Sequence, residues 1–478
     1  YPDRAQNGAI TNEGRASVWN PRLGTRPGAF HKVPPPKIDV NGDGHPVPAP
    51  IWCAGESHLP NGDILVTGGN LVNPTDSNRG QIYTDYAGIP NVFTFDPWTE
   101  TWTQQQSLEA GRWYPTQIEL ADGTTDILGG YTDQAPGAIF NQTLDMFKAP
   151  RSPLGQGRVT SGGPQPYAQT LFPRLELLPN GSVIMAGPTP LDTATFDPKT
   201  QGWSDYPDFG DARNGSNIIL EPGGYQGSWR ISLIGGYGWN QGDKGAFRTT
   251  ETTLASSASP SWTPGPKLNV QRAWENTILL PDGSKVAVGG GTGYNHLVGN
   301  YATSPSARQR QVEVYDPVRH VWRLGPPEVE DRTYHSTALL LPDGRVWSAG
   351  DDVHPRQADG NPSTSDTAEI YSPPYLFRGA RPAISRFPST LGYKQTATLR
   401  TGHSGPDPES AVLISPAAAT HSVDTSQRYV KLKVLGAAGN RLHVESPPSP
   451  EVAPPGYYML FVLDADGVPS KARWVQLS

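Results

Sequence analysis

The sequence has little cysteine, no excess of one charge, and no long apolar stretch. One cysteine, Cys53, occurs among 478 residues, so no intramolecular disulfide can form. The formal net charge of -7 comes from interspersed acidic and basic residues, which leaves no basic face and predicts no nucleic-acid partner. No apolar run approaches the roughly 18 residues of a membrane helix, so we expect no membrane span. These absences argue against a disulfide scaffold, a nucleic-acid-binding protein and a membrane-spanning chain.

Turn formers and aromatic residues are abundant instead. The 53 glycines and 50 prolines occur together with 13 Trp, 19 Tyr and 12 Phe spread along the whole chain. This combination predicts many short strands joined by tight turns, and no stretch has a clear helical pattern. The sequence begins at Tyr1 rather than at a methionine, from which we expect a processed, secreted, extracellular protein. We also expect a monomer.

A phrase recurs through the first 350 residues: a Leu-Pro-Asn/Asp-Gly type of turn, a short apolar strand, and then glycines. Asn-Gly and Asp-Gly supply the positive φ angles that tight hairpin turns need. The copies lie at 59–69, 120–130, 178–187, 280–290 and 341–350, with a diverged copy at 228–236.

A second phrase alternates with the first and contains an aromatic residue, an Asp-Pro turn and a tryptophan. It occurs at 95–102, 196–203 and 315–322. A hairpin ending in glycines followed by an outer strand, at a period of about 50 residues, is typical of kelch propeller blades. We therefore predict a seven-bladed kelch-type β-propeller over residues 1–380. Segment 16–19 is expected to pair with the last repeat and close the ring, which removes free sheet edges.

The pattern changes near residue 380. Residues 371–382 are rich in proline and aromatic residues and are interpreted as a linker. Alternating strands follow, which predicts an immunoglobulin-like β-sandwich over residues 381–478. The predicted fold is all-β throughout.

Metal-capable side chains stand just before three of the repeated turns. Cys53 precedes Leu59 by six residues, Tyr114 precedes Leu120 by six, and Tyr334 precedes Leu341 by seven. Equivalent positions on different blades converge on the hub. By composition alone Cys53 is better interpreted as an inert buried thiol, and this shared register reverses that interpretation. Tyr334 and the adjacent His335 can reach one metal only if the backbone bends between them, because neighbours in a strand face opposite sides.

Three short motifs show a specific resemblance to a known protein family. Arg112-Trp-Tyr-Pro-Thr116, Thr333-Tyr-His-Ser336 and Thr420-His-Ser-Val-Asp-Thr425 resemble the ligand motifs of the galactose oxidase and glyoxal oxidase family of copper-radical oxidases, closer to its glyoxal oxidase-like branch. The resemblance implies one copper ion bound by Tyr114, Tyr334, His335 and His421. It also implies a thioether between Cys53 and the ring of Tyr114, forming a protein-derived Tyr-Cys radical cofactor. Imidazole and tyrosinate ligands suit tetragonal Cu(II).

The same resemblance implies an activity. The radical on the Tyr114–Cys53 unit takes a hydrogen atom from a primary alcohol or hydrated aldehyde, and Tyr334 accepts the hydroxyl proton. The two electrons then pass to O2, and H2O2 forms with the aldehyde or acid. The expected partners are therefore O2 and a small alcohol, aldehyde or carbohydrate.

The chain departs from galactose oxidase at the aromatic residue that stacks on the cross-link. After the glycine pair that follows Tyr114, the sequence has Tyr131 and Thr132 where a tryptophan is expected. Trp239, in a later blade, is the favoured stacking residue, with Tyr131 as the alternative.

Two other functions are considered. One is a kelch-type binding or matrix protein with an ordinary free cysteine. The other is a propeller glycosidase, which needs paired carboxylates near the hub, and no such pair is expected on the inner strands.

Overall fold

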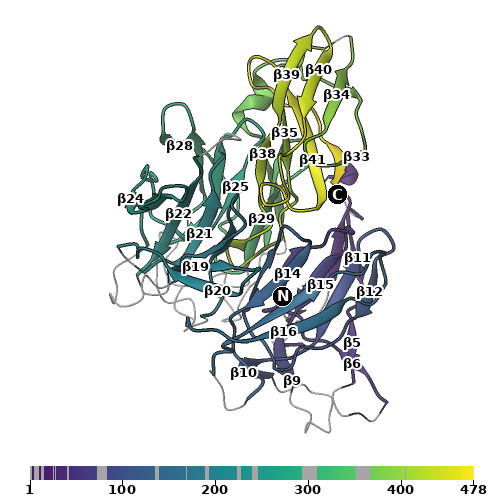
Figure 1. Ribbon diagram of the computed structural model, residues 1–478, viewed down its shortest axis with the longest axis vertical. Helices are drawn as coiled ribbons and strands as arrows, with labels where there is room; N and C mark the ends of the chain where they lie inside the picture. Colours follow the sequence, from purple (N-terminus) through teal and green to yellow (C-terminus); the bar gives the residue numbers. More distant parts are fainter. Residues whose placement is uncertain are drawn as a thin grey trace. The chain divides into compact units, whose positions relative to one another are not determined.

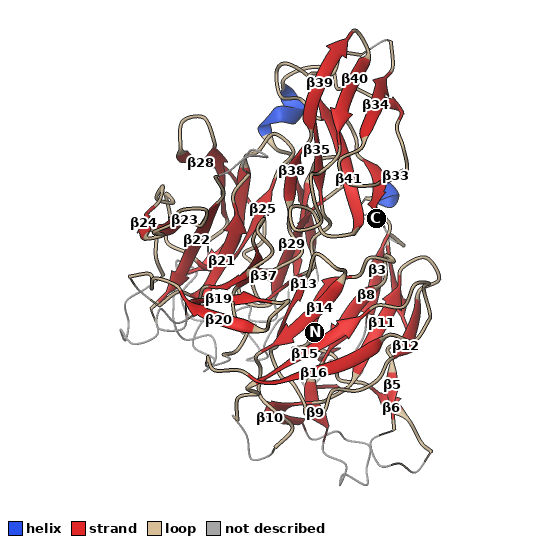
Figure 2. Ribbon diagram, viewed as in Figure 1, coloured by secondary structure: helices blue, strands red, loops and turns tan. Residues whose placement is uncertain are grey.

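The structure is a computed structural model of residues 1–478, in which strands and turns predominate (Figure 2). Among the described residues, only two short 3-10 helices, η1 (Pro21–Leu23) and η6 (Pro374–Phe377), interrupt the strands. Within that part of the chain, no helix has the length and apolarity needed to cross a membrane. The described residues are 3–4, 10–11, 16–24, 26, 28–39, 42, 44–72, 83–134, 139–167, 170–188, 193–210, 212–222, 228–238, 246–292, 309–350, 367–403 and 405–478.

The chain forms two compact units. The first contains the described residues of Tyr1–Gln117 and Thr124–Pro173. The second contains the described residues of Ile118–Gly123, Arg174–Gln357 and Ser363–Ser478. The predicted domain boundary at residue 380 lies inside the second unit and stays a prediction.

The first unit is built on two sheets of four strands. The first sheet has the order β12-β11-β8-β7. The second has the order β13-β14-β15-β16, and β13 crosses the boundary between the units. Leu59, Leu65, Ile127 and Phe147 form an apolar core with further residues of this unit. The strands are β7 (Gly55–His58), β8 (Ile64–Thr67), β11 (Val92–Asp96), β12 (Thr101–Gln104), β13 (Thr116–Glu119), β14 (Thr124–Leu128), β15 (Thr143–Lys148) and β16 (Arg158–Pro164).

The N-terminal strands form local pairs. β3 (Ala16–Trp19) pairs with β4 (Phe30–Val33), so its expected pairing with the last repeat is wrong. The cause is local: η1 turns the chain back, Asn20 N–H donates to the Ala29 carbonyl at 2.7 Å, and Trp19 stacks on Phe30. The other pairs are β1 (Asp3–Arg4) with β2 (Ile10–Thr11), β5 (Lys37–Ile38) with β6 (Val47–Pro48), and β9 (Asn70–Val72) with β10 (Tyr83–Gly88).

The second unit continues the blade pattern with three sheets of four strands and one of three, each in chain order. Each glycine-ending phrase forms the second strand of its sheet, as the repeat predicts. The strands are β17 (Leu175–Leu177), β18 (Val183–Met185), β19 (Ala194–Asp197), β20 (Gly202–Asp205), β21 (Asn214–Leu220), β22 (Arg230–Tyr237), β23 (Thr250–Leu254), β24 (Trp262–Pro264), β25 (Ala273–Leu279), β26 (Lys285–Gly291), β27 (Gln311–Asp316), β28 (Val321–Pro327), β29 (Ser336–Leu340), β30 (Val346–Gly350) and β31 (Ala368–Tyr371).

The C-terminal strands form a sandwich of two sheets (Figure 1). Leu399, Leu413, Leu442 and Leu460 pack in its interior. The outer face of the larger sheet packs its apolar residues on strands β25, β26 and β29 of the same unit. The all-β class, the propeller-type sheets and this C-terminal sandwich are therefore confirmed. The sheets are β32 (Ile384–Arg386), β34 (Thr396–Thr401), β40 (Arg441–Glu445) and β39 (Lys433–Ala438), and β33 (Thr390–Leu391), β42 (Arg473–Leu477), β41 (Gly456–Leu463), β35 (Ser410–Ile414) and β38 (Tyr429–Lys431).

Candidate metal centre

A backbone hydrogen bond connects Cys53 and Tyr114 in the first unit. Each residue precedes the first strand of its sheet, Cys53 before β7 and Tyr114 before β13. The Tyr114 N–H donates a 2.9 Å hydrogen bond to the Cys53 carbonyl. Both residues have left-handed backbone conformations, with φ of 62° at Cys53 and 68° at Tyr114. Such angles are strained for side chains other than glycine and concentrate at functional sites.

Aromatic rings cover both faces of the Tyr114 phenol. Trp113 stacks on it with a centroid distance of 3.8 Å and an interplanar angle of 9°. Phe172 stacks at 4.5 Å and 27°. The indole is fixed because Trp113 Nε1 donates to Asn70 Oδ1 at 2.8 Å. Tyr131 stacks on Trp113 with a centroid distance of 5.8 Å and an interplanar angle of 4°.

A buried arginine stands two residues before both tyrosines. Arg112 precedes Tyr114, and Arg332 precedes Tyr334. Each donates to the carbonyl of a glycine in the repeated phrase and pairs with an acid on the third strand of its sheet, which fixes where the first strand begins. The sequence interpretation missed this recurring arginine, although the sequence itself shows an arginine at a similar distance before each of these repeats. The full set is Arg112 with Gly129 and Asp145, Arg213 with Gly235 and Glu251, Arg272 with Gly289 and Glu313, and Arg332 with Gly350 and Glu369.

Tyr334 and His335 form one half of a polar aromatic cluster in the second unit. Their ring centroids lie 3.8 Å apart, which the backbone allows because His335 has a φ of 67°. The predicted bend between the two residues is therefore confirmed. The Ser336 N–H and hydroxyl both donate to the Thr333 carbonyl, at 3.0 and 2.6 Å, and hold this turn. Trp274 meets the Tyr334 ring edge-on at 4.8 Å.

His421 completes the cluster from the C-terminal sandwich. It lies in a two-residue hairpin loop between β36 (Ala419–Thr420) and β37 (Val423–Asp424). His421 and Ser422 both have positive φ, 52° and 61°, the type I′ geometry that usually requires Asn-Gly. The Thr420 hydroxyl lies 2.7 Å from His421 Nδ1.

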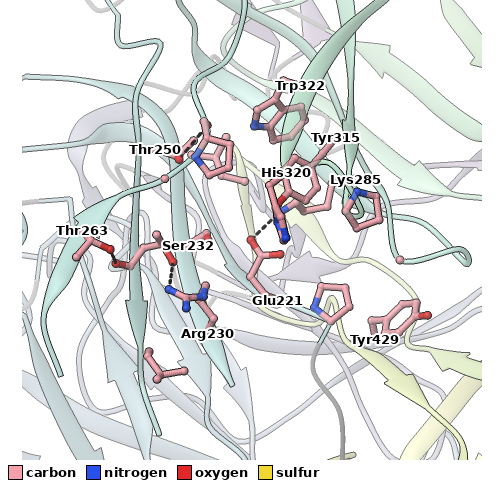
Figure 3. Close-up of a pocket in the computed structure, with 18 of the residues that line it drawn as sticks. Glu221, Arg230, Ser232, Thr250, Thr263, Lys285, Tyr315, His320, Trp322 and Tyr429 are labelled. Carbon is pink, nitrogen blue, oxygen red and sulfur yellow. Dashed lines mark hydrogen bonds and ion pairs between the residues drawn. The ribbon is translucent and has the colours of Figure 1, made fainter. Parts of the chain in front are cut away.

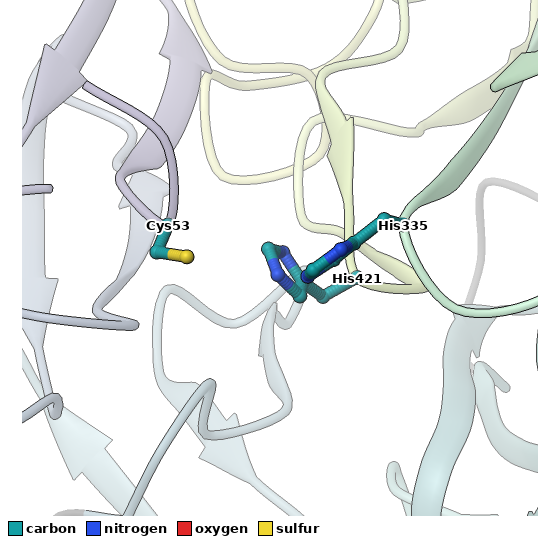
Figure 4. Close-up of side chains that lie close together, drawn as sticks. All are labelled: Cys53, His335 and His421. Atoms are coloured by element: carbon teal, nitrogen blue, oxygen red, sulfur yellow. The ribbon is translucent and has the colours of Figure 1, made fainter. Parts of the chain in front are cut away.

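The two histidines of this cluster lie close enough to bind one metal ion, and the Tyr334 ring is next to both. A ring nitrogen of His335 and one of His421 lie within 4.8 Å of each other (Figure 4). The His335 and His421 rings are nearly perpendicular, with centroids 4.4 Å apart. The Tyr334 ring lies 5.1 Å from that of His421. Two imidazoles and a phenol oxygen form a donor set that fits Cu(II).

Residues after the hairpin anchor it to the propeller sheets of the second unit. The Gln427 amide donates to the Thr277 carbonyl at 2.9 Å and accepts from the Leu279 N–H, both on β25. Arg428 donates to the Leu177 carbonyl at 2.8 Å. Asp424 accepts from the backbone N–H groups of Ala418 and Ser426, and burial raises its pKa to about 6.

The inner strands of the second unit carry carboxylates that the sequence interpretation did not expect. Glu119 lies on β13, Glu176 on β17 and Glu275 on β25. Burial raises the pKa of Glu176 to about 8 and that of Glu119 well above its usual value. Arg428 lies 3.6 Å from Glu176 and opposes the pKa increase at both groups. The inner strands therefore carry single carboxylates, and the expectation that no two of them form a glycosidase-type pair stays a prediction.

Comparisons with known proteins point to one family. Residues 381–477 match the Galactose oxidase-like, Early set domain. The chain is 29% identical to "Aldehyde oxidase GLOX" of Vitis pseudoreticulata over 89% of this chain and 82% of that protein. It is 26% identical to "Galactose oxidase" of Gibberella zeae over 90% of this chain but 61% of that protein. A solved fungal alcohol oxidase of the AA5 family, in complex with copper, shares the fold, with a TM-score of 0.73 at 21% identity over 98% of this chain and 96% of that one.

The propeller-type sheets, the Early set domain and the phenol–imidazole cluster fit a copper oxidase of the propeller class. More narrowly, residues 381–477 match the galactose oxidase-like Early set domain, and about nine tenths of the chain is similar to an aldehyde oxidase and a galactose oxidase. The individual roles of Cys53, Tyr114, Tyr334, His335 and His421 stay predictions. Trp239 lies outside the described residues.

Proposed function

We propose that this chain is a mononuclear copper-radical oxidase. It would oxidise a primary alcohol or hydrated aldehyde to the aldehyde or acid while O2 is reduced to H2O2. Relatives named as an aldehyde oxidase and a galactose oxidase support this reaction class, and they leave open an alcohol, an aldehyde or a carbohydrate as substrate. We extend the proposal to a secreted monomer.

The proposed site holds one copper ion with the ligand set that the sequence resemblance implies. Tyr334, His335 and His421 would bind copper with the Tyr114 oxygen, and Thr420 at Nδ1 leaves the coordinating role to Nε2 of His421. Bound copper supplies a one-electron redox partner that, together with an oxidised tyrosine, makes a two-electron oxidant. The donor set of the described cluster supports this assignment.

Each tyrosine has its own task in the proposed reaction. Tyr334 accepts the proton of the substrate hydroxyl, as a general base does. The oxidised Tyr114–Cys53 unit takes a hydrogen atom from the adjacent carbon. The substrate thus loses two protons and two electrons in total, and O2 receives them to form H2O2.

Trp113 is the aromatic residue that we propose to stabilise the oxidised tyrosine. Its indole lies parallel to the Tyr114 ring, and Asn70 fixes its orientation. Phe172 protects the other face of the phenol. Tyr131, the alternative considered from the sequence, stacks on Trp113 and would support its indole.

The hydrogen bond between Tyr114 and Cys53 carries the proposal, because it holds the two residues of the predicted thioether in register. Forming that bond removes the thiol hydrogen and one ring hydrogen, and their electrons and protons reduce O2 to H2O2. A peroxide-coupled screen of alcohols, sugars and aldehydes on copper-loaded protein tests the function. Peroxide release with at least one substrate is expected, and none with any substrate would favour a kelch-type binding protein.

A further inference from the structure

A polar groove separates two neighbouring sheets of the second unit, β21–β24 and β25–β28. Its volume is about 860 Å³, within the range of small-molecule sites. The groove is lined by none of the residues assigned to copper. Tyr429 and Lys431 of β38 border it from the C-terminal sandwich.

One wall of the groove is a row of hydroxyl groups. Ser232 on β22, Thr252 on β23 and Thr263 on β24 stand directly opposite one another in the sheet, so their side chains share one face. Arg230, at the exposed end of β22, donates to the Thr252 hydroxyl at 3.2 Å. Figure 3 shows Ser232, Thr263 and Arg230 on this wall.

The facing wall is a second cross-strand row, made of a cation and two aromatic rings. Lys285, Tyr315 and Trp322 stand opposite one another on β26, β27 and β28 (Figure 3). The Lys285 ammonium lies 4.1 Å from the Tyr315 ring centroid and pairs with Glu221. Burial raises the pKa of Tyr315 to about 12, so its phenol remains protonated near neutral pH.

The junction between the preceding pair of sheets, β17–β20 and β21–β24, has an apolar lining. The fold therefore does not require a polar lining at the groove. On its other face, β22 presents Ile231 and Leu233, which pack against Ile184 and Phe209 of the β17–β20 region. On the groove face, Ile234 belongs to an apolar cluster with Tyr315 and Trp322, but the neighbouring places hold Ser232 and Thr252. Apolar side chains there would close the junction, and hydroxyl groups leave room for a ligand.

We propose that this groove binds a neutral oligosaccharide. A sugar presents hydroxyl groups that donate and accept, which matches the hydroxyl row, the Arg230 donor and the Glu221 acceptor. The aromatic row is largely buried and packs beneath Lys285, so it supports this wall while the polar groups face the ligand. Glu221 and Asp282 offset the basic residues of the groove and disfavour a strongly anionic ligand.

Calorimetric titration of the full, copper-loaded chain tests this site. The probes are cellohexaose, xylohexaose and mannohexaose, with hexagalacturonic acid as the anionic counterpart. We expect at least one neutral probe to bind, and Arg230→Met and Thr252→Val each to weaken that binding at least tenfold. Thr195→Val, at the equivalent third strand β19 and outside the groove, is the matched control and should bind as the original chain does.

Oxidase turnover separates this groove from the copper site. Peroxide release from a small alcohol or aldehyde substrate should be unchanged in all three variants. The proposal is overturned if no neutral probe binds, if only hexagalacturonic acid binds, or if both groove variants keep full affinity. The last result would place the sugar in the copper site.

Discussion

The Tyr114 N–H donates to the Cys53 carbonyl, and both residues adopt positive φ angles. The two residues are 61 positions apart in sequence and precede the first strands of two different sheets. This backbone hydrogen bond sets the register of the Cys53 and Tyr114 segments without any covalent link between their side chains. The Tyr114–Cys53 thioether would therefore form within an existing fold and would not be needed to build it.

Tyr114→Phe should remove peroxide production and the cross-link while leaving the fold intact. Phenylalanine keeps the ring that Trp113 and Phe172 contact but has no phenol oxygen to oxidise or to bind copper. Peroxide assay, intact mass and thermal unfolding are the measurements. Full turnover in this variant would show that the radical resides elsewhere.

Trp113→Leu should lower the yield of the tyrosyl radical while copper still binds. Stacked aromatic pairs contribute about 0.5–1.5 kcal/mol, so the radical population should fall roughly two- to tenfold. Electron paramagnetic resonance and optical spectra of the oxidised protein measure this yield. Tyr131→Leu is the comparison, because the Tyr131 ring stacks on Trp113 at 5.8 Å, and a larger loss in this variant would reverse the assignment.

Gln427→Leu should weaken copper binding through His421. The amide satisfies the Thr277 carbonyl and the Leu279 N–H, and each buried group left without its partner costs about 1–3 kcal/mol. Copper titration and chemical unfolding test this effect, with Gln104→Leu on the exposed part of β12 as control. A variant that is less stable but binds copper unchanged would show that the hairpin holds His421 without this anchor.

Glu275→Gln should change how stability depends on pH. Burial raises the pKa of Glu275 to about 8, so the folded chain holds this proton more tightly than the unfolded chain. The stabilising effect of the bound proton is complete below the unfolded pKa near 4.5 and is lost as pH rises toward 8. The free energy of unfolding of the original chain should thus fall across pH 5–8, relative to the variant, on the order of a few kcal/mol.

Chemical unfolding at several pH values measures this difference. Glu109→Gln, at an exposed position, should show the same pH dependence as the original chain. Parallel curves for the original chain and Glu275→Gln would contradict the raised pKa.

The repeats were sufficient to predict the blade sheets and the placement of Cys53, Tyr114 and Tyr334 at the starts of first strands. The bend at His335 also followed from chemistry, because two neighbouring ligands require it. Trp113 was overlooked even though it stands in the motif itself. Its stacking on the next residue depends on the left-handed φ of Tyr114, which a sequence pattern does not reveal.

Other features depended on long-range partners that sequence spacing does not identify. In the sequence, Glu119 and Glu176 look like ordinary strand residues. Only the structure shows that Arg428, about 250 residues further along the chain, lies beside Glu176 and also acts on Glu119. Segment Ala16–Trp19 has the pattern of an edge strand, and only the return turn at η1 decides that it pairs with β4. The groove between β22 and β26 likewise requires the two rows to be seen facing each other.

The most direct measurement is the intact mass of the copper- and oxygen-treated protein, combined with alkylation of Cys53 under denaturing conditions. A Tyr114–Cys53 thioether predicts the loss of two hydrogen atoms, no alkylation of Cys53, and one peptide containing both residues after proteolysis. Tyr114→Phe, treated in the same way, should keep its hydrogens and react fully at Cys53. Complete alkylation of Cys53 in the treated original protein would contradict the radical cofactor and the oxidase mechanism built on it.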